Sequence, residues 1–327
     1  MSPAAPRMID YDGYLRLDYF PHIWCPGCGN GIILKAMLGA VERLALDRDR
    51  VAMVSGIGCS SRATGYVDFN TLHTTHGRAI AFATGVKLAR PDLTVVVVTG
   101  DGDATAIGGN HFIHAARRNL DLTVVLFNNW IYGMTGGQVS PTTPLGSRAT
   151  TAPFGNIEQP FDISGLAIAA GASFVARGSV TQPVKLSQYI EKGIRKQGFA
   201  LIEAYTPCPT AFGRQNNLKT PLDNMLWIKE RLVDVRAAEK LSPAEREGKL
   251  VTGILCDIEK PEYTERYRAL VEAMRPNGDG GDGGEENPGG AERAVITAGA
   301  HGEALVFPER EILPASAILG GDGGDAP

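Results

Sequence analysis

Residues 94–103 read T-V-V-V-V-T-G-D-G-D, a run of β-branched residues that ends in a cluster of Gly and Asp. Four successive valines make both faces of a strand apolar, so residues 94–99 are predicted to form a strand buried on both sides. A second apolar run, at 122–127, ends in Asn128 and Asn129. Polar loops directly after buried strands predict ligand binding at the carboxyl ends of a parallel sheet.

The neighbouring segments continue an alternation of strands and helices. Apolar periodicity predicts helices at 31–44, 77–88, 163–170 and 183–196, and another that ends near Arg118. Further strands are expected at 51–54, near Phe174 and at 200–204, and a long Gly/Pro/Thr loop reaches residue 160. This order predicts an α/β fold, with a mostly parallel sheet and helices on both faces.

The character of the chain changes after residue 220. We expect a binding domain at 1–220, a C-terminal helical extension at 221–276 with an amphipathic helix at 222–241, and a tail at 277–327. Gly, Asp, Glu and Asn dominate residues 277–290, which predicts a flexible linker. Residues 291–313 have some apolar content and are expected to be weakly ordered.

Composition excludes several classes of protein. The chain has 327 residues, 43% of them hydrophobic and 21% charged, and a net charge of −4. This charge gives no bulk attraction to nucleic acid or to an anionic membrane. No apolar run is long enough to span a bilayer, and the N-terminus lacks the order of a signal peptide. We therefore expect a cytoplasmic protein that binds neither nucleic acid nor membrane.

The Gly/Asp cluster and the Asn pair suit a diphosphate held by Mg²⁺. This ion prefers oxygen ligands, such as one carboxylate, an amide oxygen and a backbone carbonyl. Glycines on both sides of Asp101 allow the backbone to approach phosphates closely. The alternative is that the two segments are simple tight turns, although both follow buried strands.

Four of the five cysteines lie in turn-rich surroundings: Cys25, Cys28, Cys59 and Cys208. Together they predict either a zinc ion on four thiolates or a [4Fe–4S] cluster, and the spacing does not separate the two. A redox pair at Cys25 and Cys28 is a further alternative. Cys256 follows an apolar run and is interpreted as a core or surface thiol.

Cationic side chains near these loops are candidates for anion binding. His73 and His76 precede the helix at 77–88, where they could contact a phosphate or cap the helix. Arg62 follows the Gly/Ser-rich loop that contains Cys59, where it could bind an anionic substrate or lie on the surface.

Five motifs together resemble the beta subunits of 2-oxoacid:ferredoxin oxidoreductases. They are W-C-P-G-C-G at 24–29, G-I-G-C-S-S-R at 56–62, H-T-T-H-G-R at 73–78, T-G-D-G-D at 99–103 with I-G-G-N-H at 107–111, and N-N-W-I-Y-G-M-T-G-G-Q-x-S-P-T at 128–142. The likeness runs from about residue 19 to 216. It implies the thiamine-diphosphate-binding fold.

The resemblance also implies site residues. Cys25, Cys28, Cys59 and Cys208 match ligands of a [4Fe–4S] cluster, and Asp101, Asn129 and the backbone carbonyl of Ile131 match ligands of Mg²⁺. The positions that match the lining of thiamine diphosphate are Ile57, Gly58, Cys59, Ser60, His76, Gly102, Asp103, Gly133 and Met134. Arg62 and His76 are the candidate catalytic residues.

The implied activity is thiamine-dependent oxidative decarboxylation of a 2-oxoacid, preferably 2-oxoglutarate, with pyruvate or a branched 2-oxoacid as alternatives. The products are acyl-coenzyme A and CO₂, and electrons pass through the cluster to ferredoxin. The glutamate that activates thiamine is absent from the motifs and would come from an alpha subunit. One departure is Gly136, where many relatives carry a lysine that helps to hold substrate or coenzyme A.

Two other classes of function explain fewer of these residues. A non-oxidative thiamine decarboxylase would use the Gly/Asp and Asn loops but would not need four cysteines. A zinc scaffold or a plain electron-transfer module would use the cysteines but not the diphosphate loops.

Overall fold

The computed structural model describes residues 9–275, 296–297 and 304–305. The chain divides into two units, Met1–Ala269 and Leu270–Pro327. In the second unit, strands β11 (Ile296–Thr297) and β12 (Ala304–Leu305) form an antiparallel pair. The linker predicted at 277–290 and all but four residues of the segment 291–313 lie outside the described residues. Among the described helices, none is both long and apolar enough to cross a membrane.

The first unit is built on an eight-stranded sheet with the order β2-β1-β3-β4-β8-β7-β10-β9. The strands are β1 (Val51–Ser55), β2 (Asn70–His73), β3 (Thr94–Gly100), β4 (Thr123–Asn128), β7 (Phe174–Ser179), β8 (Ala200–Tyr205), β9 (Leu232–Asp234) and β10 (Leu250–Asp257). The pairs from β2 to β7 are parallel, and β10 runs antiparallel to β7. The predicted α/β class with a mostly parallel sheet is confirmed.

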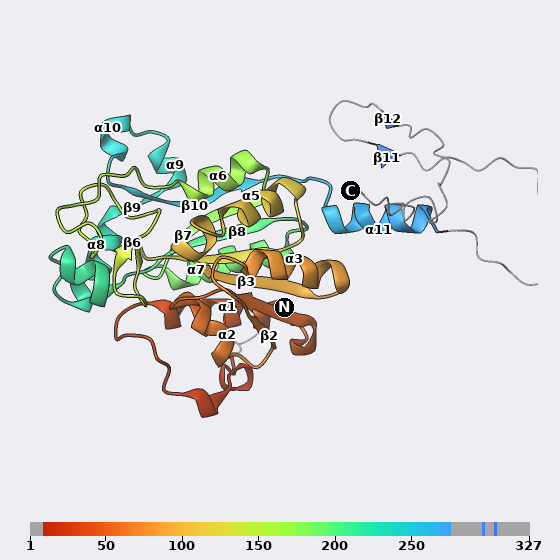
Figure 1. The fold of residues 1–327 in the computed structure, drawn as a ribbon, viewed down its shortest axis with the longest axis horizontal. Helices are drawn as coiled ribbons and strands as arrows, with labels where there is room; N and C mark the ends of the chain where they lie inside the picture. Colours follow the sequence, from red (N-terminus) through yellow and green to blue (C-terminus); the bar gives the residue numbers. More distant parts are fainter. Residues whose placement is uncertain (1–8, 276–295, 298–303, 306–327) are drawn as a thin grey trace, which may run out of the picture. The chain divides into compact units, whose positions relative to one another are not determined.

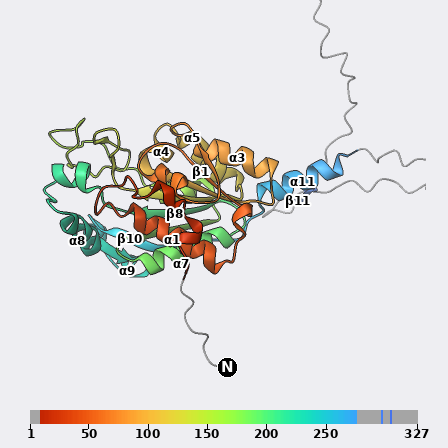
Figure 2. The same cartoon turned by 90° about the horizontal axis from the view of Figure 1, so that it is seen from below.

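Helices cover both faces of this sheet (Figures 1 and 2). On one face lie α1 (Asn30–Arg43) and α7 (Pro183–Arg195), and on the other lie α3 (Ala79–Ala89), α5 (Gly109–Arg118) and α6 (Ile163–Ala170). Val96 and Val98 join the core beneath α1 and α7, whereas Val95 and Val97 join the opposite core. The valine run is therefore buried on both sides, as its composition predicts.

The remaining helices are short or lie near the ends of the described chain. They are α2 (Ala63–Tyr66), α4 (Asp101–Thr105), α8 (Pro221–Arg231), α9 (Val235–Ala238), α10 (Pro243–Arg246) and α11 (Tyr263–Ala273). Single 3₁₀ turns occur at Asp12–Tyr14, Leu17–Tyr19, Arg48–Arg50 and Ser60–Arg62, and a π-helical turn at Pro209–Gly213.

Three local expectations are wrong. The single helix expected at 222–241 stops at Arg231, because the next residues pair as β9 with β10, Val233 opposite Val251. Strands β2, β9 and β10 are not anticipated. Because β9 and β10 lie within 221–276, that segment adds strands to the sheet as well as helices. The Gly/Asp cluster begins the short helix α4 directly after β3 instead of forming a loop.

The long segment after β4 is also partly ordered into strands. It contains the small hairpin β5 (Ile131–Tyr132) and β6 (Gln138–Val139). Because β1, β3 and β4 are parallel, the segments that follow them meet at one edge of the sheet.

Candidate functional site

A cavity of about 470 Å³ lies at this edge, between the ends of β1 and β3. The chain leaves β1 toward β2 on one side of the sheet order, and it leaves β3 toward β4 on the other side. Such points are the usual ligand sites of open α/β sheets. We call it the large cavity. Its walls are Asn30, Ile57, Gly58, Cys59, Ser60, His76, Gly100, Asp101, Gly102, Asp103, Phe127, Asn129, Ile131, Tyr132, Gly133, Met134, Thr135 and Gln138.

The large cavity brings together every residue that the sequence assigns to thiamine diphosphate and to Mg²⁺. It also contains residues that the sequence leaves unassigned: Asn30, Gly100, Phe127, Tyr132, Thr135 and Gln138. Tyr132, Thr135 and Gln138 belong to the motif at 128–142, and their place in that motif is the signal that could have identified them.

Asp101 is one of two buried carboxylates on the wall of this cavity, with 3% of its surface exposed. Its Oδ2 accepts hydrogen bonds from the hydroxyls of Ser140, at 2.6 Å, and Thr142. Burial raises the pKa of Asp101 to about 6, while these hydroxyls and backbone N–H groups lower it in part. The two hydroxyls come from the segment after β6, and the sequence does not single them out.

The other predicted Mg²⁺ ligands lie on a sharp turn after β4. Trp130 has a φ of 63°, a left-handed conformation that is unusual for a bulky residue. The turn is held by hydrogen bonds from Trp130 N to Asn128 Oδ1 and from Ile131 N to Asn129 Oδ1, both 3.2 Å. It places Asn129 and Ile131 on the cavity wall beside Asp101.

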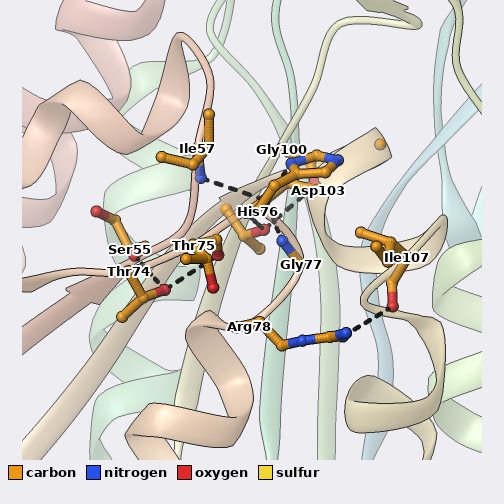
Figure 3. Close-up of polar contacts among 12 residues, drawn as sticks. Ser55, Ile57, Thr74, Thr75, His76, Gly77, Arg78, Gly100, Asp103 and Ile107 are labelled. Carbon is orange, nitrogen blue, oxygen red and sulfur yellow. Dashed lines mark hydrogen bonds and ion pairs between the residues drawn. The ribbon is translucent and has the colours of Figure 1, made fainter.

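Asp103 joins the loops around the large cavity (Figure 3). Its Oδ1 accepts hydrogen bonds from the amides of Ile57, at 3.2 Å, and Gly77, at 2.8 Å, and lies 2.8 Å from Nδ1 of His76. Its Oδ2 accepts a hydrogen bond of 2.7 Å from Thr99 Oγ1. One carboxylate thus fixes the segments that follow β1 and β2 against the end of β3.

Two glycines allow this close packing. A Cβ on Gly56 would lie 2.1 Å from Asp103 Oδ2, and a Cβ on Gly102 would lie 2.4 Å from the ring of Tyr132. The Tyr132 hydroxyl donates to the carbonyl of Gly102 at 3.1 Å, and its ring lies edge-on to His76. The cavity wall at Gly102 therefore has no room for a side chain.

A second cavity, of about 270 Å³, contains all four cysteines that the sequence groups together. We call it the cysteine cavity. Its walls are Ile23, Trp24, Cys25, Cys28, Asn30, Cys59, Asn129, Gly133, Met134, Pro207, Cys208 and Thr210. Five of these residues, Asn30, Cys59, Asn129, Gly133 and Met134, also line the large cavity, so the two cavities share a wall.

The thiols of the cysteine cavity affect one another electrostatically. Burial raises the pKa of Cys28 to about 11, and the neighbouring Cys25 and Cys208 act in the same direction. Burial likewise raises the pKa of Cys59 to about 11, with Cys208, Cys28 and Cys25 adding to the effect. The four sulfurs are thus close neighbours, although the described residues contain no group of three or more acidic, His or Cys side chains arranged around a single ion.

A [4Fe–4S] cluster differs from one zinc ion in this respect, because each of its thiolates binds a different iron atom. Zinc needs all four sulfurs within about 2.3 Å of one point. Four thiols around one cavity of about 270 Å³ are a donor set that suits either group.

Three other residues lie apart from the walls of the large cavity. Arg62 is exposed and is not part of that wall, although its charge opposes the upward shift in the pKa of Cys59. Cys256, interpreted from the sequence as a core or surface thiol, lies in β10 and is half-buried. Gly136 has a φ of 117°, so a lysine there would need a different backbone conformation.

Comparisons with known proteins agree with this geometry. Residues 56–204 match the family model described as thiamine pyrophosphate enzyme, C-terminal TPP binding domain. The chain is 59% identical to the 2-oxoglutarate synthase subunit KorB of Archaeoglobus fulgidus, over 81% of this chain and 94% of that protein. It is 56% identical to the subunit of the same name from Methanothermobacter marburgensis, over 80% and 92%.

A solved structure is similar as well. It is the 2-oxoglutarate:ferredoxin oxidoreductase from Magnetococcus marinus with 2-oxoglutarate, coenzyme A and succinyl-CoA bound. The TM-score is 0.72 and the identity 35%, with 83% of this chain and 92% of that chain covered.

Proposed function

We propose that this chain, which belongs to the family of 2-oxoacid:ferredoxin oxidoreductase beta subunits, holds thiamine diphosphate with Mg²⁺ in the large cavity and a [4Fe–4S] cluster in the cysteine cavity. The observation that carries the proposal is the convergence of both predicted residue sets on two cavities with a common wall. A thiamine decarboxylase without a redox function would not need the second cavity. A zinc scaffold would not need the first.

In the large cavity, Asp101, Asn129 and the carbonyl of Ile131 would hold Mg²⁺, and the glycine-rich walls would hold the diphosphate. A carboxylate, an amide and a carbonyl are the oxygen ligands that this ion prefers. Thiamine diphosphate bound there would supply a nucleophilic carbon for the keto group of a 2-oxoacid and an electron sink for the loss of CO₂.

His76 is the side chain best arranged to handle a proton in this cavity. Asp103 lies against its Nδ1, so Nδ1 carries the proton of the neutral ring and Nε2 remains to accept or release one. The side chain is 37% exposed and lines the cavity, so both solvent and substrate can reach it. Arg62 stays a candidate for binding the substrate's carboxylate from outside the described walls.

In the cysteine cavity, Cys25, Cys28, Cys59 and Cys208 would be the four ligands of the cluster. The cluster would supply one-electron transfer. Cys59 and Gly133 belong to both cavities, so this chain's own wall would keep the path between the two groups short. Metal ligands are thiolates, so binding of a metal group would release the protons of these thiols, and the raised pKa values of Cys28 and Cys59 oppose that release.

The large cavity is incomplete as an active site. Its carboxylates are Asp101 and Asp103, which accept hydrogen bonds from within the chain, and no glutamate lies on the described walls. The glutamate that activates thiamine would come from an alpha subunit, in a hetero-oligomer with two copies of each chain. The similar proteins are named as subunits, which supports this assembly.

For the substrate we propose 2-oxoglutarate, which is oxidised with coenzyme A to succinyl-CoA and CO₂ while two electrons pass to ferredoxin. The support is the names of the similar 2-oxoglutarate synthase subunits and the ligands named in the Magnetococcus marinus structure. Pyruvate and a branched 2-oxoacid are the alternatives. Comparing kcat/KM for the three acids on the intact complex distinguishes them.

The experiment that tests the proposal measures iron, sulfide and zinc in protein purified without oxygen, together with low-temperature EPR. About four irons and four sulfides per chain, with a reducible cluster signal, are expected. Zinc without sulfide would overturn the redox function and leave a thiamine-binding protein of another kind.

A further inference from the structure

A buried carboxylate on the wall of a separate cavity, of about 320 Å³, has no role in the function proposed so far. Glu203 lies in β8 among apolar neighbours, with 2% of its surface exposed. It accepts hydrogen bonds from Asn128 Nδ2, at 2.8 Å, Ser164 Oγ, at 2.6 Å, and Arg177 Nε, at 2.7 Å. Arg177 also pairs with Asp162 at the surface.

Stability does not explain this arrangement. Removing two charges from water offsets most of their attraction, so a buried ion pair contributes little net stability compared with apolar residues of similar volume. The pair of Glu203 and Arg177 is nevertheless fully hydrogen-bonded on the carboxylate side. The carboxylate also orients the groups that donate hydrogen bonds to it.

Glu203 determines which way the amide of Asn128 faces. An ionised carboxylate only accepts hydrogen bonds, so the NH₂ group of Asn128 must point toward Glu203. Its Oδ1 then points the other way, where it accepts the hydrogen bond from Trp130 N. Trp130 has a left-handed backbone conformation, and this bond helps to hold the turn that carries Asn129 and Ile131, together with a hydrogen bond from the Thr143 hydroxyl to the Trp130 carbonyl.

The side-chain amide of Asn128 also lies near a hydroxyl that contacts Asp101, the third predicted Mg²⁺ ligand. The hydroxyl of Thr142 lies 3.0 Å from Asn128 Oδ1 and donates to Asp101 Oδ2. Hydrogen bonds thus run from Arg177 through Glu203 to Asn128 and from Thr142 to Asp101, and Asn128 Oδ1 and the Thr142 hydroxyl are in contact between these two sets. These contacts end at Asp101 on one side and, on the other, at the turn after Asn128 that carries Asn129 and Ile131.

We propose that Glu203, charge-balanced by Arg177, is a positioning residue that holds Asn128 and thereby the Mg²⁺ ligands of the large cavity. The inference rests on the proposed function, because it assumes that Asp101, Asn129 and Ile131 bind the ion. Glu203 is not on the wall of the large cavity. It is connected to that wall through Asn128, which precedes the wall residue Asn129.

The test uses the intact complex with its partner subunit and compares wild type, Glu203→Gln and Glu262→Gln. Glutamine keeps the shape of Glu203 but can also donate, so it no longer fixes the amide of Asn128. Glu262 is the matched control, since it is also a buried carboxylate, 4% exposed, that accepts backbone N–H bonds from Asp121, Thr264 and Glu265. Calorimetry at a fixed concentration of thiamine diphosphate gives the Mg²⁺ affinity, and steady-state kinetics give kcat.

The expected result is a Mg²⁺ affinity about 10–100-fold weaker in Glu203→Gln, the usual effect of losing a partner behind a metal ligand. Activity should return toward the wild-type kcat at saturating Mg²⁺, whereas general damage to the fold would lower kcat at every concentration. Glu262→Gln should bind Mg²⁺ like wild type. Equal Mg²⁺ affinities in all three proteins, or equal losses of affinity in both variants, would overturn the inference about Glu203. Neither result would contradict the proposed function.

Two further outcomes are distinguishable. If the wild-type complex bound thiamine diphosphate without any dependence on Mg²⁺, the proposed function and the inference would both be wrong. If Glu203→Gln does not fold, the double variant Glu203→Gln with Arg177→Met is measured instead. It removes both charges together and so leaves no unpaired buried cation. It should fold and still show the weakened Mg²⁺ affinity, and wild-type affinity in this variant would contradict the inference.

Discussion

Replacing Gly56 by alanine is expected to displace the Asp103 carboxylate. The new Cβ would lie 2.1 Å from Oδ2 and 2.6 Å from Cγ of Asp103, and Cβ contacts below 3.0 Å essentially do not occur. Oδ2 would have to retreat by about 0.9 Å, the difference between 3.0 and 2.1 Å. Gly56 does not have a positive φ, so the effect of the substitution comes from this contact and not from its own backbone.

The retreat cannot preserve all the hydrogen bonds of Asp103, because its donors lie on three separate segments, at Ile57, His76–Gly77 and Thr99. One hydrogen bond to a charged group contributes about 1.5–3 kcal/mol, and overpacking costs about 1–3 kcal/mol. These terms overlap, so we expect a loss of about 3 kcal/mol in the free energy of unfolding. For a domain of this size, that lowers Tm by about 6–12 °C.

Thermal denaturation of the anaerobic protein measures this shift. Gly85→Ala is the matched control, since a Cβ at this position in α3 would meet no atom within 4 Å. Alanine is favoured over glycine inside a helix by about 0.5–1 kcal/mol, so this variant should be slightly more stable than wild type. A Tm for Gly56→Ala equal to that of wild type would refute the role given to Asp103.

Asp101→Ala should abolish retention of thiamine diphosphate, measured on the purified protein, while the iron content stays at the wild-type value; unchanged retention would contradict the Mg²⁺ assignment. Cys208→Ala should lower iron and sulfide below four per chain and leave thiamine binding intact, and an intact four-iron EPR signal would mean that another group is the ligand. Thr220→Ala removes the capping box of α8 and should lower the free energy of unfolding by about 1 kcal/mol with both cofactor contents unchanged. No change in Tm would show that this cap is not needed.

The interior of the sheet could be predicted from the sequence, but its edges could not. The valines of β3 face a core on each side, so local composition alone identifies the strand. Strand β2, Asn70–His73, is largely exposed and lacks that signature. The periodic apolar residues beyond Arg231 favour a continued helix, yet Val233 pairs with Val251, a contact between segments that no local pattern encodes.

The site could be predicted in part for a related reason. Loops after adjacent parallel strands must meet, so the order of strands and loops along the chain is enough to predict that Asp101 and Asn129 lie together. Ser140 and Thr142, which hold Asp101, come from an irregular segment where no periodicity indicates direction. Glu203 offers a signal of a different kind, because a single acidic residue inside an apolar strand is rarely buried without a partner.

The shared wall restricts how the specificity of this protein can be redesigned. Gly133 is an example, since a Cβ there would lie 3.1 Å from Cys208 Sγ and 3.9 Å from Cys59 Sγ. A library that varied Gly133 or Met134 to accept a different 2-oxoacid would alter the surroundings of the thiols at the same time. Thr135 and Gln138 line the large cavity and not the cysteine cavity, so a library at these two positions would leave the surroundings of the thiols unchanged.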